Sequence, residues 1–312
     1  MLFLRYSAVA ALAASTLAAQ GGKVFYFPKP VRPEPYKLPM RPLTRLADLK
    51  ARHPGQSDWR ELVIHDDNSR AWVVSEGPGA KSARRLYPDS PAWWAVLEGR
   101  IRFEIEGPVG TFQTIEARKG SYVYAPERML HSLEVVGDRP AIRFEVTLAR
   151  ATPVFEEPQR NTGEVRYIPV GLSHASNPDD VPDPQGKPWP LHVQIDELIE
   201  QHKGQPSWSV PAMRKNRVRG NFICGLASAE RPPRAGDRGH FHADFAEFWV
   251  VMKGQLRWTM EGIGEPLIAS EGDIVYAPPN TFHVPQFYGK EGINCRLTSS
   301  TFPSANHIYD AR

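Results

Sequence analysis

Cysteine is scarce in this chain, and this limits the metal and redox chemistry that the sequence supports. Only Cys224 and Cys295 occur among the 312 residues, and no CxxC pair is present. A zinc site built on cysteine ligands is therefore not supported. Two cysteines in an exported protein can pair, but their distance in space decides this, so a disulfide and two buried thiols both stay open.

An excess of charge of one sign is also missing. Lys and Arg together number 38 and Asp and Glu 35, which leaves a formal net charge of only +3. The sequence also has no local stripe of basic residues. Neither its net charge nor its charge distribution therefore indicates binding to nucleic acid. It contains no GxSxG elbow, P-loop, HExxH helix or Rossmann signature, so serine nucleophiles and nucleotide hydrolysis are not expected.

The N-terminal apolar run is too short to cross a bilayer. It extends from Tyr6 to Ala19, which is 14 residues, whereas a membrane helix needs roughly 20. The run follows Arg5 and ends in small residues, with cleavage expected near Ala18 or Ala19, which is the pattern of a secretory signal peptide. The alternative is an N-terminal helix packed on the core. We expect export, to the periplasm or the medium, and no membrane span.

The chain contains an internal repeat. Three pairs of segments match in order, at offsets of 155, 152 and 149 residues: WWAVLEGRIRFEIEG (93–107) with FWVVMKGQLRWTMEG (248–262), GSYVYAPERMLH (120–131) with GDIVYAPPNTFH (272–283), and LADLKARHPGQSDW (46–59) with IDELIEQHKGQPSW (195–208). Each half thus begins with Leu and Ile residues spaced three to four apart, which predicts a short helix. Alternating runs broken by the 30 prolines and 24 glycines follow, and these predict an antiparallel sandwich or barrel.

These patterns divide the chain into five parts. They are a signal peptide (1–19), a Pro-rich N-terminal arm (20–42), a first strand-rich unit (43–150), a Pro-rich connector (151–190) and a second strand-rich unit (191–312). A hydrophobic content of 41% is enough for a packed core in each unit.

The second unit contains a set of residues that suits a metal ion. His240 and His242 are two positions apart, so in a strand their side chains share one face. Glu247 and His283 are expected on neighbouring strands. Three imidazoles and one carboxylate suit divalent Fe, Mn, Co, Cu, Ni or Zn, and in an octahedral ion they leave about two positions for substrate or oxygen. The alternative is a set of surface or core histidines.

The spacing of this set resembles the two motifs of the cupin superfamily. The first motif has HxH, three or four residues, Glu, six residues and Gly; the second has Gly, five residues, Pro and a later His. His240 to Gly254 and Gly272 to His283 fit, although Asn280 and Phe287 depart from the usual residues at two positions that are not ligands. The resemblance implies an all-β bicupin, with two antiparallel jelly-roll barrels from an internal duplication, each preceded by a short helix. A homodimer is also implied by the resemblance.

The first unit keeps only one of the four ligands. The positions equivalent to His240, His242, Glu247 and His283 are Arg85, Tyr87, Ala92 and His131. We therefore expect one metal ion per chain, in the C-terminal barrel, and a first barrel that is mainly structural or binds an organic ligand. Among bicupins, oxalate decarboxylases keep ligands in both barrels, which weakens that assignment; some dioxygenases use only one barrel, so that pattern stays open.

The functional hypotheses follow from this metal set. The first is a metal-dependent oxidoreductase of the dioxygenase type acting on a small organic substrate, with Glu247 as the catalytic base. The alternatives are a non-redox lyase, isomerase or decarboxylase, and a sugar- or small-molecule-binding protein without catalysis. Four residues in or beside the motifs are candidates for the substrate pocket, with barrel core or a solvated loop as the alternative for each: Arg238, Trp249, Trp258 and Phe287.

Overall fold

The computed structural model describes residues 29–30, 32–33, 35–107, 110–158, 168–169, 187–215, 218–230, 236–300 and 307–309. The expected signal peptide (1–19) and most of the Pro-rich connector lie outside the described residues. None of the described helices is long and apolar enough to cross a membrane.

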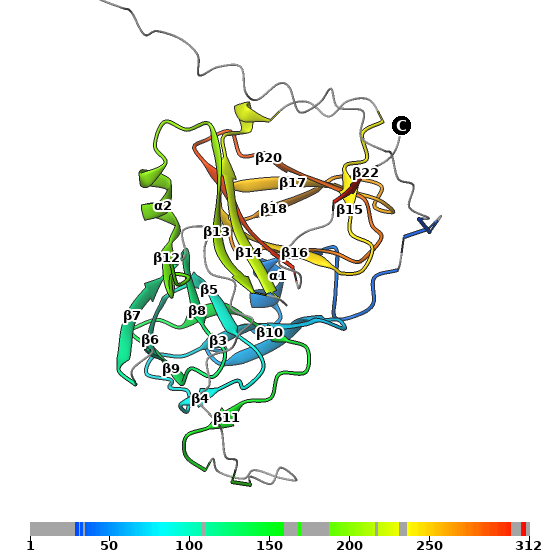
Figure 1. Cartoon of the computed structure of the whole chain (residues 1–312). Coiled ribbons are helices and arrows are strands. Elements are labelled where there is room, and N and C mark those ends of the chain that lie inside the picture. Colours follow the sequence, from blue (N-terminus) through cyan, green and yellow to red (C-terminus); the bar gives the residue numbers. More distant parts are fainter. Residues whose placement is uncertain are drawn as a thin grey trace, which may run out of the picture.

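The chain forms two barrels, each made of a six-stranded and a five-stranded antiparallel sheet (Figure 1). The sheets of barrel 1 have the orders β12-β8-β5-β10-β3-β2 and β11-β4-β9-β6-β7. Barrel 1 uses β2 (Trp59–His65), β3 (Ser69–Glu76), β4 (Arg85–Leu86), β5 (Ala92–Glu98), β6 (Arg100–Glu106), β7 (Phe112–Arg118), β8 (Ser121–Ala125), β9 (His131–Val135), β10 (Ala141–Leu148), β11 (Val154–Phe155) and β12 (His192–Gln194).

Barrel 2 repeats this plan, with the orders β1-β19-β16-β21-β14-β13 and β18-β17-β20-β15-β22. Its strands are β1 (Leu43–Thr44), β13 (Ser207–Lys215), β14 (Val218–Gly225), β15 (His240–Phe241), β16 (Glu247–Lys253), β17 (Gln255–Met260), β18 (Leu267–Ser270), β19 (Ile274–Ala277), β20 (His283–Phe287), β21 (Asn294–Ser300) and β22 (Ile308–Tyr309). The helices are α1 (Leu46–Ala51), α2 (Ile195–Gln201) and the 3-10 turn η1 (Ala227–Ala229). The predicted all-β fold and the short helix before each repeat are confirmed.

The two repeats exchange their first strands. β1 precedes barrel 1 in the chain but pairs with β19 of barrel 2, and β12 precedes barrel 2 but pairs with β8 of barrel 1. Each following helix packs at the same place: a Cβ on Gly272 would meet Leu46, and a Cβ on Gly120 would meet Ile195. The backbone N–H of Leu46 also donates to Asp273 Oδ1 at 2.9 Å. Through this strand exchange, each half of the chain contributes a strand to the barrel formed by the other half.

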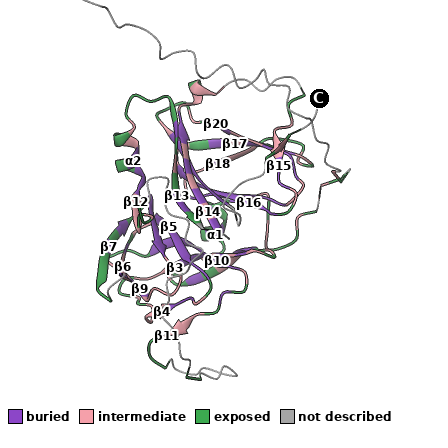
Figure 2. Cartoon of the chain, in the orientation of Figure 1, coloured by how far each residue is buried: buried purple, intermediate pink, exposed green. Residues whose placement is uncertain are grey.

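The six-stranded sheets face each other and share one core. The rings of Trp93 and Phe248 stack with centroids 6.3 Å apart at an angle of 7°, and Tyr122 meets Phe222 edge-on at 5.9 Å. β5 and β16 are therefore buried on both faces, as their burial colour in Figure 2 shows, and most of their residues are apolar. β6, which has one face toward solvent, alternates between buried and partly exposed residues.

Cys224 and Cys295 form a disulfide, which resolves the question that the sequence leaves open. They lie opposite each other in the antiparallel pair of β14 and β21, with Cα atoms 4.1 Å apart. The bridge joins strands 71 residues apart in sequence, and both cysteines are fully buried. A disulfide is compatible with a location outside the cytoplasm.

Candidate metal centre

Three strands of barrel 2 bring the four sequence-predicted ligands together. His240 begins β15, Glu247 begins β16 and His283 begins β20, while His242 lies directly after β15. His240 and His283 are direct partners in the β15–β20 pair. Candidate ligand atoms of all four residues lie within 4.8 Å of one another. The expected convergence of these side chains is confirmed.

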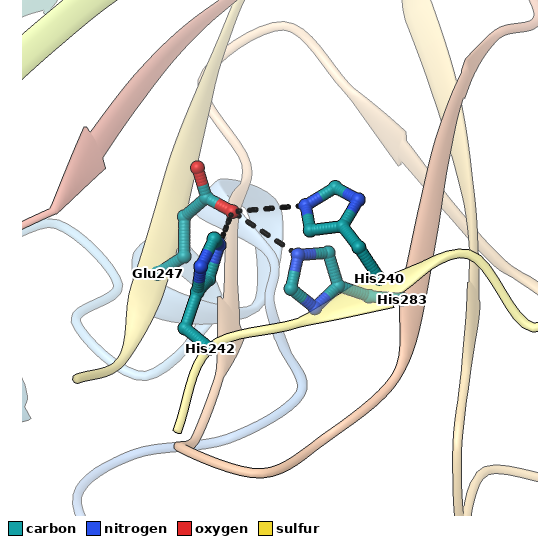
Figure 3. Close-up of side chains that lie close together, drawn as sticks. All are labelled: His240, His242, Glu247 and His283. Atoms are coloured by element: carbon teal, nitrogen blue, oxygen red, sulfur yellow. Dashed lines mark hydrogen bonds and ion pairs between the residues drawn. The ribbon is translucent and has the colours of Figure 1, made fainter. Parts of the chain in front are cut away.

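One carboxylate oxygen is the centre of this group (Figure 3). Glu247 Oε2 lies 2.9 Å from His242 Nε2, 3.1 Å from His283 Nε2 and 3.9 Å from His240 Nε2. Glu247, His242 and His283 are buried, whereas the His240 side chain keeps 16% of its surface exposed. The exposed edge of the group is therefore at His240.

The local sequence explains how His240 and His283 are held. Gly239 has a φ of +76°, and a Cβ at this position would meet the carbonyl oxygen of His283, so only glycine lets the strands approach this closely. His283 Nδ1 lies 2.9 Å from the Thr281 carbonyl oxygen. An N–H that donates to this carbonyl leaves Nε2 as the free lone pair, which is the tautomer that a metal-binding imidazole needs.

The group is electrostatically suited to a cation. Burial alone would raise the pKa of Glu247, but contacts with three imidazoles outweigh it and hold the pKa well below its usual range. Burial lowers the pKa of His240, which favours the neutral imidazole. An ionised carboxylate and neutral imidazoles are the states that metal ligation requires. Among the residues that the structure describes, this is the one group of His, Cys, Asp and Glu side chains with such geometry.

His307 lies beside the group, although the sequence motifs assign it no role. Its ring centroid is 4.1 Å from that of His240 and 5.3 Å from that of His242. The short strand β22 brings it there, since Tyr309 pairs with His240 and Ile308 with Phe241. Such a contact between the end of the chain and β15 leaves no local spacing signal in the sequence.

The expected pocket residues lie in different places. The Trp249 ring meets His283 edge-on at 5.1 Å and packs against Trp258 at 5.7 Å, so both indoles form a wall beside the metal group. Phe287 lies at the far end of β20, with the Arg296 guanidinium 5.6 Å from its ring. Arg238 pairs with Glu261 and lies 4.2 Å from the Phe282 ring centroid. Their roles toward a substrate stay predictions.

Barrel 1 keeps the framework of the site with other residues. Arg85 pairs with His131 just as His240 pairs with His283. Arg85 Nη2 lies 3.5 Å from Oε1 of the buried Glu145, which also contacts Arg143 and, at 3.6 Å, Arg60. Of these arginines, Arg85 is the one that takes the position of a metal-group imidazole of barrel 2.

Comparisons with known proteins agree with this architecture. The family model named Cupin domain matches residues 228–299, and no curated protein matches the chain in sequence. A variant of oxalate decarboxylase from Bacillus subtilis superposes with a TM-score of 0.52 at 14% identity, over 93% of this chain and 88% of that chain. The Lactobacillus farciminis oxalate decarboxylase formate complex gives 0.53 at 12% identity, over 90% and 91%.

At these identities the likeness to the decarboxylases shows the fold alone. The family match spans η1 to β21 and includes all four residues of the metal group. Residues 228–299 are therefore a cupin domain, and the chain has the two-barrel cupin fold, with a group able to hold one metal ion in its C-terminal barrel.

Proposed function

We propose that this chain is a metal-dependent enzyme that oxygenates a small organic substrate in barrel 2. The observation that supports the proposal is the convergence of three imidazoles and one ionised carboxylate, with an exposed edge at His240. His240, His242, Glu247 and His283 would hold a redox-active divalent ion, which would supply the chemistry for combining an organic substrate with dioxygen. Barrel 1 would contribute the shared core and no second metal.

The protein residues have separate tasks in this proposal. Glu247 contacts the imidazoles through Oε2, whereas its Oε1 faces Arg219 Nη2 at 3.9 Å. Oε2 would hold the ion, which leaves Oε1 to accept a proton from the substrate. The fully buried wall of Trp249 and Trp258 would keep bulk water from the reacting atoms.

A non-redox lyase or decarboxylase is the second candidate. The same donor set suits zinc, which has no redox chemistry and acts as a Lewis acid. Consumption of dioxygen distinguishes the two candidates. A third candidate is a binding protein whose metal only orders the barrel; in that case Glu247→Gln would change stability and abolish no turnover. We further propose that the protein is exported, which the disulfide supports.

The experiment begins with elemental analysis of the full chain purified without a metal-affinity tag. The double variant His240→Ala/His283→Ala removes two ligands, and His131→Ala removes the equivalent histidine of barrel 1 as the matched control. We expect about one equivalent of metal in the wild type and in His131→Ala, and a loss of at least tenfold in the double variant. Equal metal content in all three proteins would contradict the proposal.

The second stage is oxygen-electrode screening of the metal-loaded wild type with small acids and phenols. Oxygen uptake that depends on substrate, and that disappears in Glu247→Gln, supports oxygenation. Substrate turnover at an undiminished rate without oxygen would overturn oxygenation in favour of the non-redox candidate.

A further inference from the structure

Barrel 2 contains a buried arginine that forms no ion pair within 4 Å among the described residues. Arg296 lies on β21 with 8% of its surface exposed, and its Nε and Nη1 atoms have no hydrogen-bond partner among the described residues. It is the register partner of Val251 on β16. Trp249, two residues away on the same face of β16, contacts His283, so Arg296 faces the barrel interior that contains the metal group. A buried guanidinium without a partner is unfavourable.

Two more polar side chains face the same interior. Arg219 and Glu247 flank Ser300 in the register of β14, β21 and β16, and the Nε atom of Arg219 is buried without a hydrogen-bond partner in the described part of the chain. Thr298 lies between Ser300 and Arg296 along this face of β21, and its buried Oγ1 is also without a partner there. Arg219, Thr298 and Arg296 thus form a row of hydrogen-bond donors beside Glu247.

Barrel 1 shows how the same arginine is neutralised when no ligand is needed. Arg143 pairs with Val96 and Val74, as Arg296 pairs with Val251 and Ile223, so the two arginines are equivalent in the repeat. Arg143, however, has carboxylate partners within the chain. Its Nη1 lies 2.7 Å from Glu76 Oε2, and its Nε lies 3.3 Å from Glu145 Oε2.

Barrel 2 has lost both of these carboxylates. The register places Thr298 at the position of Glu145 and Gly225 at that of Glu76, where the Phe287 ring takes the space of a side chain. It also places Asn221 at the position of Trp72, whose indole in barrel 1 lies under the guanidinium groups of Arg60 and Arg70. An acid and an indole are thus replaced by smaller, uncharged side chains.

We propose that barrel 2 binds an aromatic carboxylic acid between these residues and the metal group. Its carboxylate would take the place of the Glu145 side chain, between Arg296 and Arg219, with Thr298 Oγ1 as a further donor. Its ring would take the place of the Trp72 indole, over Asn221. The inference rests on the proposed function, because it names the substrate class of that same site.

The charges of the interior agree with an anionic ligand. The formal charges of Arg219 and Arg296 are matched in number by those of Glu247 and Glu230, although among these residues only Arg219 and Glu247, at 3.9 Å, lie within ion-pair distance. A divalent ion added to this balanced set leaves surplus positive charge in a buried space, and a carboxylate offsets part of it. Arg219 lies nearest to Glu247, so the acid would bind beside the metal ligands.

The test is calorimetric titration of the metal-loaded full chain with benzoate, acetate, benzyl alcohol and chloride at constant ionic strength. We expect benzoate to bind more tightly than the three others. Thr298→Glu supplies the carboxylate that Glu145 provides in barrel 1, and should weaken benzoate binding at least about tenfold while raising the melting temperature. Arg296→Gln should weaken it similarly. Arg257→Gln, an arginine of the same barrel that pairs with Gln286, is the matched control and should leave the affinity within about twofold.

The outcomes separate the inference from the proposed function. Metal-loaded protein that binds neither benzoate nor acetate, or binding that Thr298→Glu and Arg296→Gln leave unchanged, overturns the inference and leaves the metal site intact. Acetate binding as tight as benzoate overturns the aromatic part. If the protein takes up no metal but binds benzoate, and Arg296→Gln weakens that binding, the proposed function is overturned and the anion site is supported. Thr298→Glu keeps the test valid if Arg296→Gln fails to fold.

Discussion

Trp249 meets His283 edge-on, with ring centroids 5.1 Å apart at an angle of 69°. Their counterparts in barrel 1, Trp94 and His131, lie 5.2 Å apart at 66°. The histidine Nδ1 atoms also lie at matching distances from a carbonyl oxygen two residues earlier, 2.9 Å in barrel 2 and 3.0 Å in barrel 1. The repeat has therefore kept the support of this histidine where the other three ligands are absent.

Replacement of Gly239 by alanine should weaken metal binding. The added Cβ would meet the carbonyl oxygen of His283 and push β15 away from β20, which displaces His240. We expect a loss of metal affinity of about tenfold or more, measured by competition with a chromophoric chelator. Gly236→Ala is the control, because Gly236 has a φ of +81° but nothing near its added Cβ. Equal effects of both variants would assign the loss to backbone strain and refute the close-approach argument.

His131 should make barrel 1 sensitive to mild acid. Burial, aided by the nearby Arg85 charge, lowers the pKa of His131 from 6.5 to about 4. His131 therefore binds a proton more readily in the unfolded chain than in the folded protein. Its contribution to the unfolding free energy is fully present above pH 6.5 and is lost as the pH falls toward 4. The expected loss is on the order of 3 kcal/mol.

The measurement compares urea unfolding of the wild type and His131→Gln between pH 7 and pH 4. The difference in unfolding free energy between the two proteins should shift in favour of the variant as the pH falls. A constant difference across this range would show that His131 titrates normally in the folded protein.

Glu145→Gln should destabilise the protein strongly. Burial by itself would raise the pKa of Glu145, but the charges of Arg143, Arg85 and Arg60 outweigh it and lower the pKa to about 2. Removing the charge leaves the largely buried Arg85 without an ion pair among the described residues and leaves Arg143 with Glu76 alone, at a cost of about 3–5 kcal/mol in unfolding free energy. The stabilisation by Glu145 is present above pH 4.5 and is lost as the pH falls toward 2.

Urea unfolding at pH 7 measures this loss, with Glu116→Gln as the control. Glu116 pairs with Arg102 at 2.6 Å on the surface, where an ion pair contributes about 0–1 kcal/mol. A Glu145→Gln cost no larger than that of Glu116→Gln would refute the role of the buried network.

Phe248→Ala should destabilise both barrels together. Phe248 packs against both Trp93 and Phe144 of barrel 1, with ring centroids 6.3 and 6.1 Å away. Truncation leaves a cavity in the shared core and should cost about 3–5 kcal/mol. Differential scanning calorimetry should show one transition at lower temperature. Two separate transitions in the wild type would mean that the barrels unfold independently and would contradict the prediction. Phe112→Ala is the control, because the Phe112 ring is partly exposed, and it should cost less than about 1 kcal/mol.

Local patterns in the sequence predicted much of this protein. The spacing of His240 and His242, and the matching of Gly239 to Gly254 and Gly272 to His283, were sufficient to predict the metal group, because positions two apart on a strand share a face. The repeat predicted that Arg85 occupies the place of His240, and the strand register agrees. The helices α1 and α2 were also expected from local spacing.

Other features had no local signal. The Cys224–Cys295 bridge, the approach of His307 to His240 and the place of Arg143 beside Glu145 all depend on which strands pair. The contrast between Arg143, which has carboxylate partners, and Arg296, whose Nε and Nη1 atoms have no hydrogen-bond partner among the described residues, also depends on strand pairing. Spacing along one strand cannot show which residue lies opposite on the next.

The amino-acid sequence by itself therefore determined two antiparallel repeats and a histidine–glutamate group in the second, since strand periodicity and turn positions are properties of short segments. The tertiary structure decided how the repeats join. β1 and β12 are exchanged between barrels because each barrel offers an open sheet edge and a glycine, Gly272 or Gly120, at which the following helix can pack. It also decided which arginines are neutralised within the chain, because burial and pairing are settled only when distant strands meet.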